Sequence, residues 1–283
     1  MKKKSVGGKF VYVADNMYPE FSGGAELSDY GLLWYLEKHH DVEIIRITSQ
    51  DLFPKHIEMY LKRGYKFLLS NFTQCHGPSI RELIINAENK YYIIEHDHKY
   101  LYTRDPSKYN DFQAPENQII NKLLYVNAKY VFAQSKKHKE IMEKNLKISN
   151  IVNIGMSMYT TDCIEILTQL NRYRADWPDT INKKACIVRS NNPTKNQMGS
   201  ERYCQLNNIE YDLIGLEPTA KYPDGDMSWD NLMKRIAAYE TIVMIPSVFE
   251  TFNRVIHEAR MLGLKVISSD LNGCMSEDWF SKL

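Results

Sequence analysis

Residues 241–259 read TIVMIPSVFETFNRVIHEA, and this stretch decides the predicted fold. A run of largely apolar residues, 241–245, precedes a loop that begins at Pro246, and apolar side chains then recur at helical spacing. A strand, a loop and a helix in this order form the repeating unit of proteins with parallel sheets. Glu250 lies in the loop and Glu258 lies one to two turns into the helix, so at about 1.5 Å of rise per residue their separation is at most about 12 Å.

The same pattern recurs along the rest of the chain. The other predicted strands are 10–14, 42–45, 66–69, 91–94, 130–133, 151–154, 185–188, 211–214 and 264–267, with helical periodicity between many of them. The strand signal lapses between residues 156 and 184, where Asp176-Trp177-Pro178-Asp179 supplies a breaker. We therefore predict an α/β protein of two Rossmann-like domains, residues 1–157 and 158–283, whose parallel sheets face a cleft that binds the ligand.

The composition is that of a soluble globular protein. Of the 283 residues 43% are hydrophobic and 25% charged, which argues against disordered and fibrous proteins, and the formal net charge of +1 gives no global attraction to nucleic acid. No run approaches the ~18 to 20 apolar residues that cross a bilayer. The five cysteines lack metal-binding or disulfide spacing, so we expect a cytoplasmic protein without stable membrane insertion.

Charged residues that follow strands are the candidates for binding a phosphorylated ligand. Two glutamates at this spacing suit the two ends of a sugar–diphosphate–nucleoside, and the helix start between them offers N–H groups to phosphate. Arg189 and Lys195 follow the strand 185–188, where a guanidinium and an ammonium suit diphosphate oxygens. Solvated charges on a surface loop or helix give the same pattern, and the residues alone leave both interpretations open.

The sequence as a whole resembles the retaining glycosyltransferases of the GT-B fold, particularly glycosyltransferase family 4. The resemblance rests on Pro246-Ser247, on the Glu-x7-Glu pair Glu250 and Glu258 followed by Ala259, and on the segment 262–267. It implies a metal-free transfer of a hexose or pentose, with retention, from a nucleotide-sugar donor that is UDP-linked. Apart from this donor we expect no cofactor.

The resemblance also implies roles for individual residues. Glu250 would hold the donor sugar, Glu258 the ribose, and Arg189 and Lys195 the diphosphate, while Phe252-Asn253 stands at the family's Phe-Gly turn. The loop 22–26 resembles the family's glycine loop, in which Gly23 and Gly24 would bring backbone amides to the donor; a tight loop before a helix is the alternative. The expected donor-binding residues are Gly23, Gly24, Arg189, Lys195, Glu250, Phe252, Asn253 and Glu258, of which Arg189, Lys195 and Glu250 also count as catalytic.

The segment Glu95-His96-Asp97-His98 ends an apolar strand where many members of the family carry a histidine that faces the acceptor. We expect His96 and Asp97 to take part in catalysis; structural hydrogen bonding and a metal site are the alternatives, and alternating residues rarely converge on a metal. The other expected acceptor-binding residues are His98, Tyr100, Arg104, Lys136 and Lys137. We predict no metal site, because turn and capping chemistry explains Asp224-Gly225-Asp226 better than metal binding.

The acceptor is the least determined part of the prediction. The segment 95–101 resembles short glycosyltransferases of T-even-like phages, which implies 5-hydroxymethylcytosine in phage DNA as acceptor and the host cytoplasm as location. Lys136, Lys137 and Lys139 would then contact DNA phosphates, although such runs are usually solvated helix faces. A cell-surface polysaccharide or lipopolysaccharide is an alternative acceptor. Val188, Asn196 and Asn253, where the family has glycine, favour a different alternative, a non-catalytic nucleotide-sugar-binding protein. The sequence does not predict an oligomeric state.

Overall fold

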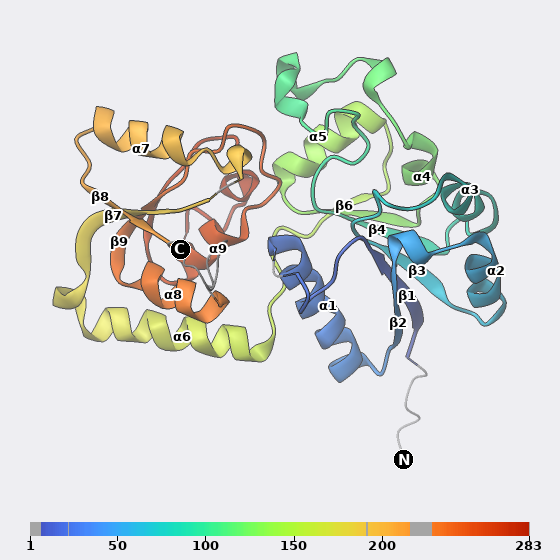
Figure 1. The fold of residues 1–283 in the computed structure, drawn as a ribbon, viewed down its shortest axis with the longest axis horizontal. Coiled ribbons are helices and arrows are strands. Elements are labelled where there is room, and N and C mark those ends of the chain that lie inside the picture. Colours follow the sequence, from blue (N-terminus) through green and yellow to red (C-terminus); the bar gives the residue numbers. More distant parts are fainter. Residues whose placement is uncertain (1–6, 22, 191, 216–227, 283) are drawn as a thin grey trace, which may run out of the picture. The chain divides into compact units, whose positions relative to one another are not determined.

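The computed structural model describes residues 7–21, 23–190, 192–215 and 228–282. The chain divides into two compact units, Met1–Thr160 and Thr161–Leu283, which we call unit 1 and unit 2. Each unit has a parallel sheet with helices around it (Figure 1). The alternation of apolar runs and helical periodicity in the sequence produces this arrangement, because a buried parallel strand is apolar on both faces.

Among the residues described, the sheet of unit 1 has six strands in the order β2-β1-β3-β4-β5-β6, and all of its pairs are parallel. The chain steps from β1 to β2 on one side and to β3 on the other, which creates a switch point of the kind that places ligands beside the carboxyl ends of strands. The strands are β1 (Lys9–Ala14), β2 (Glu43–Thr48), β3 (Lys66–Leu69), β4 (Tyr91–Glu95), β5 (Tyr130–Ala133) and β6 (Ile151–Asn153).

The helices of unit 1 cover both faces of its sheet. Alternate residues of β1 point to opposite faces: Val11 joins the larger core with α2 to α5, and Tyr12 joins a smaller core with Leu33 of α1. The segment 96–121 between β4 and α4 contains three short 3-10 turns, Pro106–Lys108, Asn110–Phe112 and Glu116–Gln118. The helices are α1 (Gly24–His40), α2 (Pro54–Lys62), α3 (Gly77–Asn86), α4 (Lys122–Val126) and α5 (Lys136–Leu146).

Unit 2 is smaller and follows the same plan. Its described sheet has four parallel strands in the order β10-β9-β7-β8. Ala185 and Ile187 of β7 pack with Cys204 and Val243 in its core. The strands are β7 (Asn182–Val188), β8 (Tyr211–Ile214), β9 (Tyr239–Val243) and β10 (Lys265–Ile267), and the helices are α6 (Thr161–Asp176), α7 (Gln197–Leu206), α8 (Trp229–Ala237) and α9 (Arg254–Met261).

One element differs from the sequence-based expectation. Helix α6 lies where the sequence shows only a lapse in strand signal, and it buries Leu167. Helix α4 begins at Lys122, and Ile119 before it forms an antiparallel bridge with Leu101. In the described part of the chain, none of the helices combines the length and apolar content needed to cross a bilayer.

Candidate functional site

Two loops at the carboxyl edge of the unit 2 sheet are bound to each other. One follows β7 and ends in the 3-10 turn Pro193–Lys195, and the other follows β9. The Ser247 N–H donates to the Thr194 carbonyl at 3.1 Å, and the Asn196 side-chain amide donates to the Ile245 carbonyl at 3.0 Å. These bonds place Lys195 beside Glu250, with the Lys195 Nζ 2.6 Å from the Glu250 Oε2.

The backbone of Glu250 is fixed on both sides. Its N–H donates to the Leu271 carbonyl at 2.8 Å, and its own carbonyl accepts from the Gly273 N–H at 2.7 Å. The Glu250 side chain is 13% exposed and the Lys195 side chain 32% exposed, so the pair is partly open to solvent. Sequence reasoning assigns these two residues to different parts of a donor, and the structure brings them into direct contact.

Glu258 lies in the second turn of α9 and is almost fully buried, with 1% of its surface exposed. The indole N–H of Trp229 and the Nε–H of Arg254 both donate to its Oε1, each at 2.7 Å. Burial raises the pKa of Glu258, and the Arg254 charge and the two hydrogen bonds oppose that rise. Trp229 and Arg254 are part of this site, and sequence reasoning missed both.

Asn196 and Asn253 lie where the resemblance places glycine. Both have left-handed backbone conformations, with φ of 51° and 61°, a region that favours glycine and tolerates asparagine best among other residues. Each also caps a helix: the Asn196 side chain accepts from the Gly199 N–H at the start of α7, and the Asn253 side chain accepts from the Ile256 N–H at the start of α9. Asparagine therefore keeps the backbone conformation and adds a cap.

We expect Asn253→Ala to destabilise unit 2 by about 2 to 3 kcal/mol, because alanine loses the cap and is strained at positive φ. Asn253→Gly should cost less than about 1 kcal/mol, since glycine relieves the strain and costs little as a cap. Urea unfolding followed by tryptophan fluorescence measures the difference, because three of the four tryptophans, Trp177, Trp229 and Trp279, lie in unit 2. Equal destabilisation by both variants would show that the left-handed conformation does not govern this position.

Two further donor candidates occupy different surroundings. Arg189 is exposed directly after β7, and its backbone N–H donates to the Ile214 carbonyl at 2.7 Å. Phe252 is buried, with its ring centroid 5.1 Å from that of His257 and 6.2 Å from that of Trp279. The Phe252 side chain therefore belongs to the core of unit 2, and its backbone at the start of α9 is the part that can approach a ligand.

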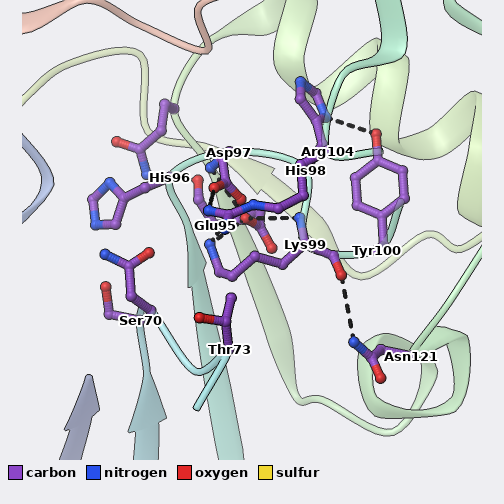
Figure 2. Close-up of polar contacts among 12 residues, drawn as sticks. Ser70, Thr73, Glu95, His96, Asp97, His98, Lys99, Tyr100, Arg104 and Asn121 are labelled. Atoms are coloured by element: carbon purple, nitrogen blue, oxygen red, sulfur yellow. Dashed lines mark hydrogen bonds and ion pairs between the residues drawn. The ribbon is translucent and has the colours of Figure 1, made fainter. Parts of the chain in front are cut away.

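The carboxyl end of β4 in unit 1 carries a partly buried charge cluster, which we call the β4 cluster: Glu95, Asp97, Lys99 and Arg104 (Figure 2). The Lys99 ammonium, 1% exposed, lies 2.5 Å from Glu95 and 3.2 Å from Asp97. Arg104 also pairs with Asp97, and the Tyr125 hydroxyl donates to Glu95. The sequence selects Asp97 and Arg104 as candidate site residues. It does not predict that Lys99 pairs with both Glu95 and Asp97.

Burial and ion pairing act differently on the two carboxyl groups of the β4 cluster. Burial raises the pKa of Glu95 to about 7, although Lys99 works against it. Burial also disfavours the charge on Asp97, but Lys99 and Arg104 outweigh burial and hold its pKa well below the usual range. Asp97 is therefore a permanent anion at neutral pH and does not accept a proton there.

We expect Lys99→Met to destabilise the protein by roughly 3 to 5 kcal/mol, the usual cost of leaving buried carboxylates without their cation. The matched control is Lys62→Met, which removes an exposed ion pair with Glu58 and should cost less than about 0.5 kcal/mol. Chemical unfolding measures both variants. A loss below about 1 kcal/mol for Lys99→Met would contradict the assigned role of this lysine.

The expected acceptor-binding residues do not all reach the surface. His98 and Tyr100 are 1% and 0% exposed, and the His98 Nδ1 lies 2.9 Å from the Tyr100 hydroxyl. Burial lowers the pKa of His98 to about 3, so this ring stays neutral. Both side chains lie inside unit 1, and their contact with an acceptor stays a prediction; Arg104, with 49% of its side chain exposed, keeps access to solvent.

His96 turns away from the β4 cluster (Figure 2). Its Nε2 lies 2.8 Å from the Oδ1 of Asp29, a buried residue of α1 that sequence reasoning missed. The sequence pattern does not predict this contact, because the two residues are 67 positions apart. His96 keeps 10% of its side chain exposed at the end of β4.

The remaining expected residues lie at helix starts of unit 1. Gly23 is the N-cap of α1, and Gly24 is its first residue. Lys136 and Lys137 open α5, and the Lys137 ammonium lies 5.0 Å from the centroid of the Phe112 ring.

Within the described ranges, no three histidine, cysteine, aspartate or glutamate side chains gather as a metal site. The segment Asp224-Gly225-Asp226 lies outside the residues that the structure describes.

A cavity of about 320 Å³ lies within unit 1 beside the β4 cluster. Lys99 and Arg104 line it together with polar and aromatic groups, including Thr73, Tyr102 and Asn121. Tyr102 is 76% exposed. The lining of the cavity therefore combines aromatic and apolar side chains with hydrogen-bonding groups.

No protein-family model matches the sequence, and no curated protein matches it. Solved structures do match. HepE of Anabaena in complex with UDP and glucose is 15% identical with a TM-score of 0.51, over 95% of this chain and 82% of that one. A glycosyltransferase of Rickettsia africae is 15% identical with a TM-score of 0.56, over 94% and 80%. The α,α-trehalose 6-phosphate synthase of Burkholderia multivorans is 8% identical with a TM-score of 0.59, over 96% and 84%.

These matches define the fold. The neighbours are GT-B glycosyltransferases, and the chain shares their two-domain α/β architecture with parallel sheets. The fold class predicted from the sequence is thus confirmed. At these identities the likeness defines the fold alone, and membership of glycosyltransferase family 4 stays a prediction.

Proposed function

We propose that this protein is a glycosyltransferase that moves a sugar from a nucleoside diphosphate, UDP in particular, to an acceptor. The observation that carries the proposal is the Lys195–Glu250 contact, which brings a cation and a carboxylate together at the carboxyl edge of the unit 2 sheet. Buried Glu258 lies in the helix that follows. HepE, one of the structural neighbours, was solved with UDP and glucose, and this supports the choice of donor.

Glu258 is proposed to bind the ribose of the donor. Trp229 and Arg254 both donate to its Oε1 and so fix the orientation of the carboxylate. Among the contacts of the described residues, none occupies the Glu258 Oε2, and this oxygen can accept hydrogen bonds from vicinal hydroxyls. The Arg254 charge opposes the rise that burial gives the Glu258 pKa, and bonds to a charged acceptor are strong.

Lys195 and Arg189 are proposed to bind the diphosphate. When the bond between the anomeric carbon and the phosphate oxygen breaks, negative charge accumulates on the leaving oxygens, and fixed donors there lower the barrier most. Lys195 would then exchange Glu250 for phosphate, which releases Glu250 to accept from hydroxyls of the donor sugar. The Gly23 and Gly24 amides and the start of α9 at Phe252 and Asn253 complete the proposed set of donors.

The acceptor is proposed to bind unit 1 at the carboxyl end of β4, where His96 and Arg104 follow the strand. Arg104 also lines the cavity of about 320 Å³. Asp97 contributes a fixed negative charge there rather than a proton acceptor. As the resemblance implies, we also propose that the reaction retains the configuration at the anomeric carbon and that it needs no metal.

Replacing Glu258 tests the proposed donor site. Glu258→Gln keeps the acceptor for Trp229 and Arg254 but substitutes an amide for the second oxygen, so nucleoside diphosphate binding should weaken by ~1.5 to 3 kcal/mol, about 10- to 150-fold. Isothermal calorimetry with UDP measures the change. The matched control is Glu240→Gln, an exposed glutamate of β9, which should bind UDP like the wild type. Unchanged affinity in Glu258→Gln would refute the ribose assignment.

For the acceptor we propose 5-hydroxymethylcytosine in DNA. The supporting observation is that Lys136, Lys137 and Lys139 lie together in the first turn and a half of α5, directly after the carboxyl end of β5. Lysine side chains grouped in this way can contact successive phosphates. A cell-surface polysaccharide or lipopolysaccharide remains the competing acceptor, and a non-catalytic nucleotide-sugar-binding protein is the competing class.

Neutralising the three lysines should flatten the dependence of log DNA affinity on log salt concentration by roughly 0.9 for each phosphate that the protein no longer neutralises. Fluorescence anisotropy with duplex DNA at several salt concentrations measures the slope for the Lys136→Gln, Lys137→Gln, Lys139→Gln triple variant. The double variant Lys55→Gln, Lys62→Gln on α2 is the control and should keep the wild-type slope. A wild-type protein without measurable affinity for DNA would contradict this acceptor and favour the glycan.

A further inference from the structure

The cavity of about 320 Å³ in unit 1 is lined by two cations from the segment after β4, Lys99 and Arg104. Lys99 is the more deeply buried of the two, with 1% of its side chain exposed, and its Nζ lies 5.7 Å from the centroid of the Phe72 ring, which also lines the cavity. Arg104 lies nearer the surface, with 49% of its side chain exposed. A ligand that enters the cavity therefore meets positive charge both at the opening and in the interior.

The carboxylates that pair with these cations do not line the cavity. Of the described residues that form its lining, none is an aspartate or a glutamate. Arg104 bonds Asp97 through one nitrogen, Nη2, among the contacts of the described residues. A guanidinium carries five N–H donors, so Arg104 keeps donors for a second anion while it stays paired with Asp97. The cavity is therefore suited to an anionic group.

Hydrogen bonds fix two segments that line the cavity. The loop after β3 is held by Asp15, whose carboxylate accepts from the Thr73 N–H at 3.0 Å. In the segment after β4, the Tyr102 N–H donates to the Gln118 carbonyl at 3.0 Å. Thr73 and Tyr102 both belong to the lining. Because these segments are already ordered, binding a ligand here loses little conformational entropy.

The backbone of Arg104 has a conformation that residues other than glycine rarely adopt. Its φ is 54°, in the left-handed region, and its N–H donates to the Leu101 carbonyl at 3.1 Å. Such conformations cost free energy and are concentrated at binding and active sites. Here the cost falls on the residue that carries the exposed cation of the cavity.

Phosphate in a nucleic acid is the anion that these groups favour. A guanidinium bonds two phosphate oxygens at once, and an ammonium adds a point charge. The ring of Tyr102, 76% exposed, lines the same cavity, and an aromatic ring beside a cation is the combination on which nucleic-acid bases stack. Lys136, Lys137 and Lys139 follow β5, which pairs with β4, so further positive charge lies at the same edge of the sheet.

We propose that this cavity is a phosphate subsite for the acceptor, in which Arg104 bonds one phosphate of a nucleic-acid strand and Lys99 supplies a second positive charge. The inference rests on the proposed glycosyltransferase function and specifies how unit 1 holds a DNA acceptor. The ring of Tyr102 packs against the nucleoside next to that phosphate. Arg104 binds and does not react, because no bond to phosphorus forms or breaks in sugar transfer.

Binding of a dinucleotide tests the subsite without the transfer reaction. The probe is thymidylyl-thymidine, which carries one phosphodiester, and its matched control is the methylphosphonate analogue, which has a similar shape and no charge. NMR titration of the wild-type protein should show that the analogue binds about 10-fold more weakly or worse, the scale for hydrogen bonds to a charged group. Because this comparison uses the wild-type protein, a loss of folding does not affect it.

Variants show whether the dinucleotide binds in the cavity. Arg104→Gln should weaken dinucleotide binding about 10-fold or more, whereas Arg81→Gln, which replaces an exposed arginine of α3, should keep the affinity within about twofold. Arg104→Lys should fall between the two, since lysine keeps the charge but loses the planar fork. Circular dichroism confirms that each variant is folded, and the Kd for UDP should not change because the donor is assigned to unit 2.

Three results would overturn the phosphate subsite and leave the glycosyltransferase proposal intact. The first is a wild-type protein that does not bind the dinucleotide or binds the uncharged analogue equally well. The second is wild-type affinity in Arg104→Gln. The third is glucuronate that binds more tightly than the dinucleotide and depends on Arg104, which would identify an acidic glycan as the occupant. A protein that neither binds UDP nor transfers sugar would instead overturn the proposed function.

Discussion

A carboxylate that leaves water must find a compensating donor, and this constraint organises the carboxyl edge of both sheets. Parallel strands end at one edge, where the loops that follow them bring acidic side chains into partly buried surroundings. In unit 1, Lys99 lies between Glu95 and Asp97, while hydroxyl groups and His96 surround Asp29. These contacts join residues from separate strands and loops, so the same bonds that neutralise charge also fix the geometry of the edge.

In unit 2 the same constraint shapes the proposed donor site. Lys195 neutralises Glu250, and Arg254 neutralises Glu258, to which the Trp229 indole also donates a hydrogen bond. A nucleotide sugar offers the complementary groups, because its phosphates attract cations and its hydroxyls donate to carboxylates. Binding would therefore exchange the Lys195–Glu250 contact for contacts with the ligand, and such an exchange avoids leaving a charge unpaired. Asn196 and Asn253 hold the two loops in left-handed conformations from which the helices α7 and α9 begin.

The strands were predictable because each buried parallel strand is a short continuous apolar run, and each of the ten runs singled out in the sequence overlaps a strand of the structure. The sequence also predicted that Glu250 lies in a loop and Glu258 in the helix after it, since both belong to one strand–loop–helix unit. Asp29, Lys99 and Trp229 were missed because their roles depend on folding. Asp29 and Trp229 meet partners 67 and 29 positions away, and Lys99 stands out only once its burial is known. The burial of His98 and Tyr100 was not predictable, because both lie in the loop after β4, where alternation along a strand no longer applies.

The central claim, that the protein transfers sugar from a nucleotide donor, is tested most directly by measuring UDP release from UDP-sugars with the acceptor present and identifying the product by mass spectrometry. With DNA that contains 5-hydroxymethylcytosine as the acceptor, the account predicts one UDP released for each sugar added, and loss of both signals in Glu250→Gln. Binding of UDP-sugar without release or transfer, to this DNA or to a polysaccharide or lipopolysaccharide acceptor, would contradict the claim and identify a binding protein instead.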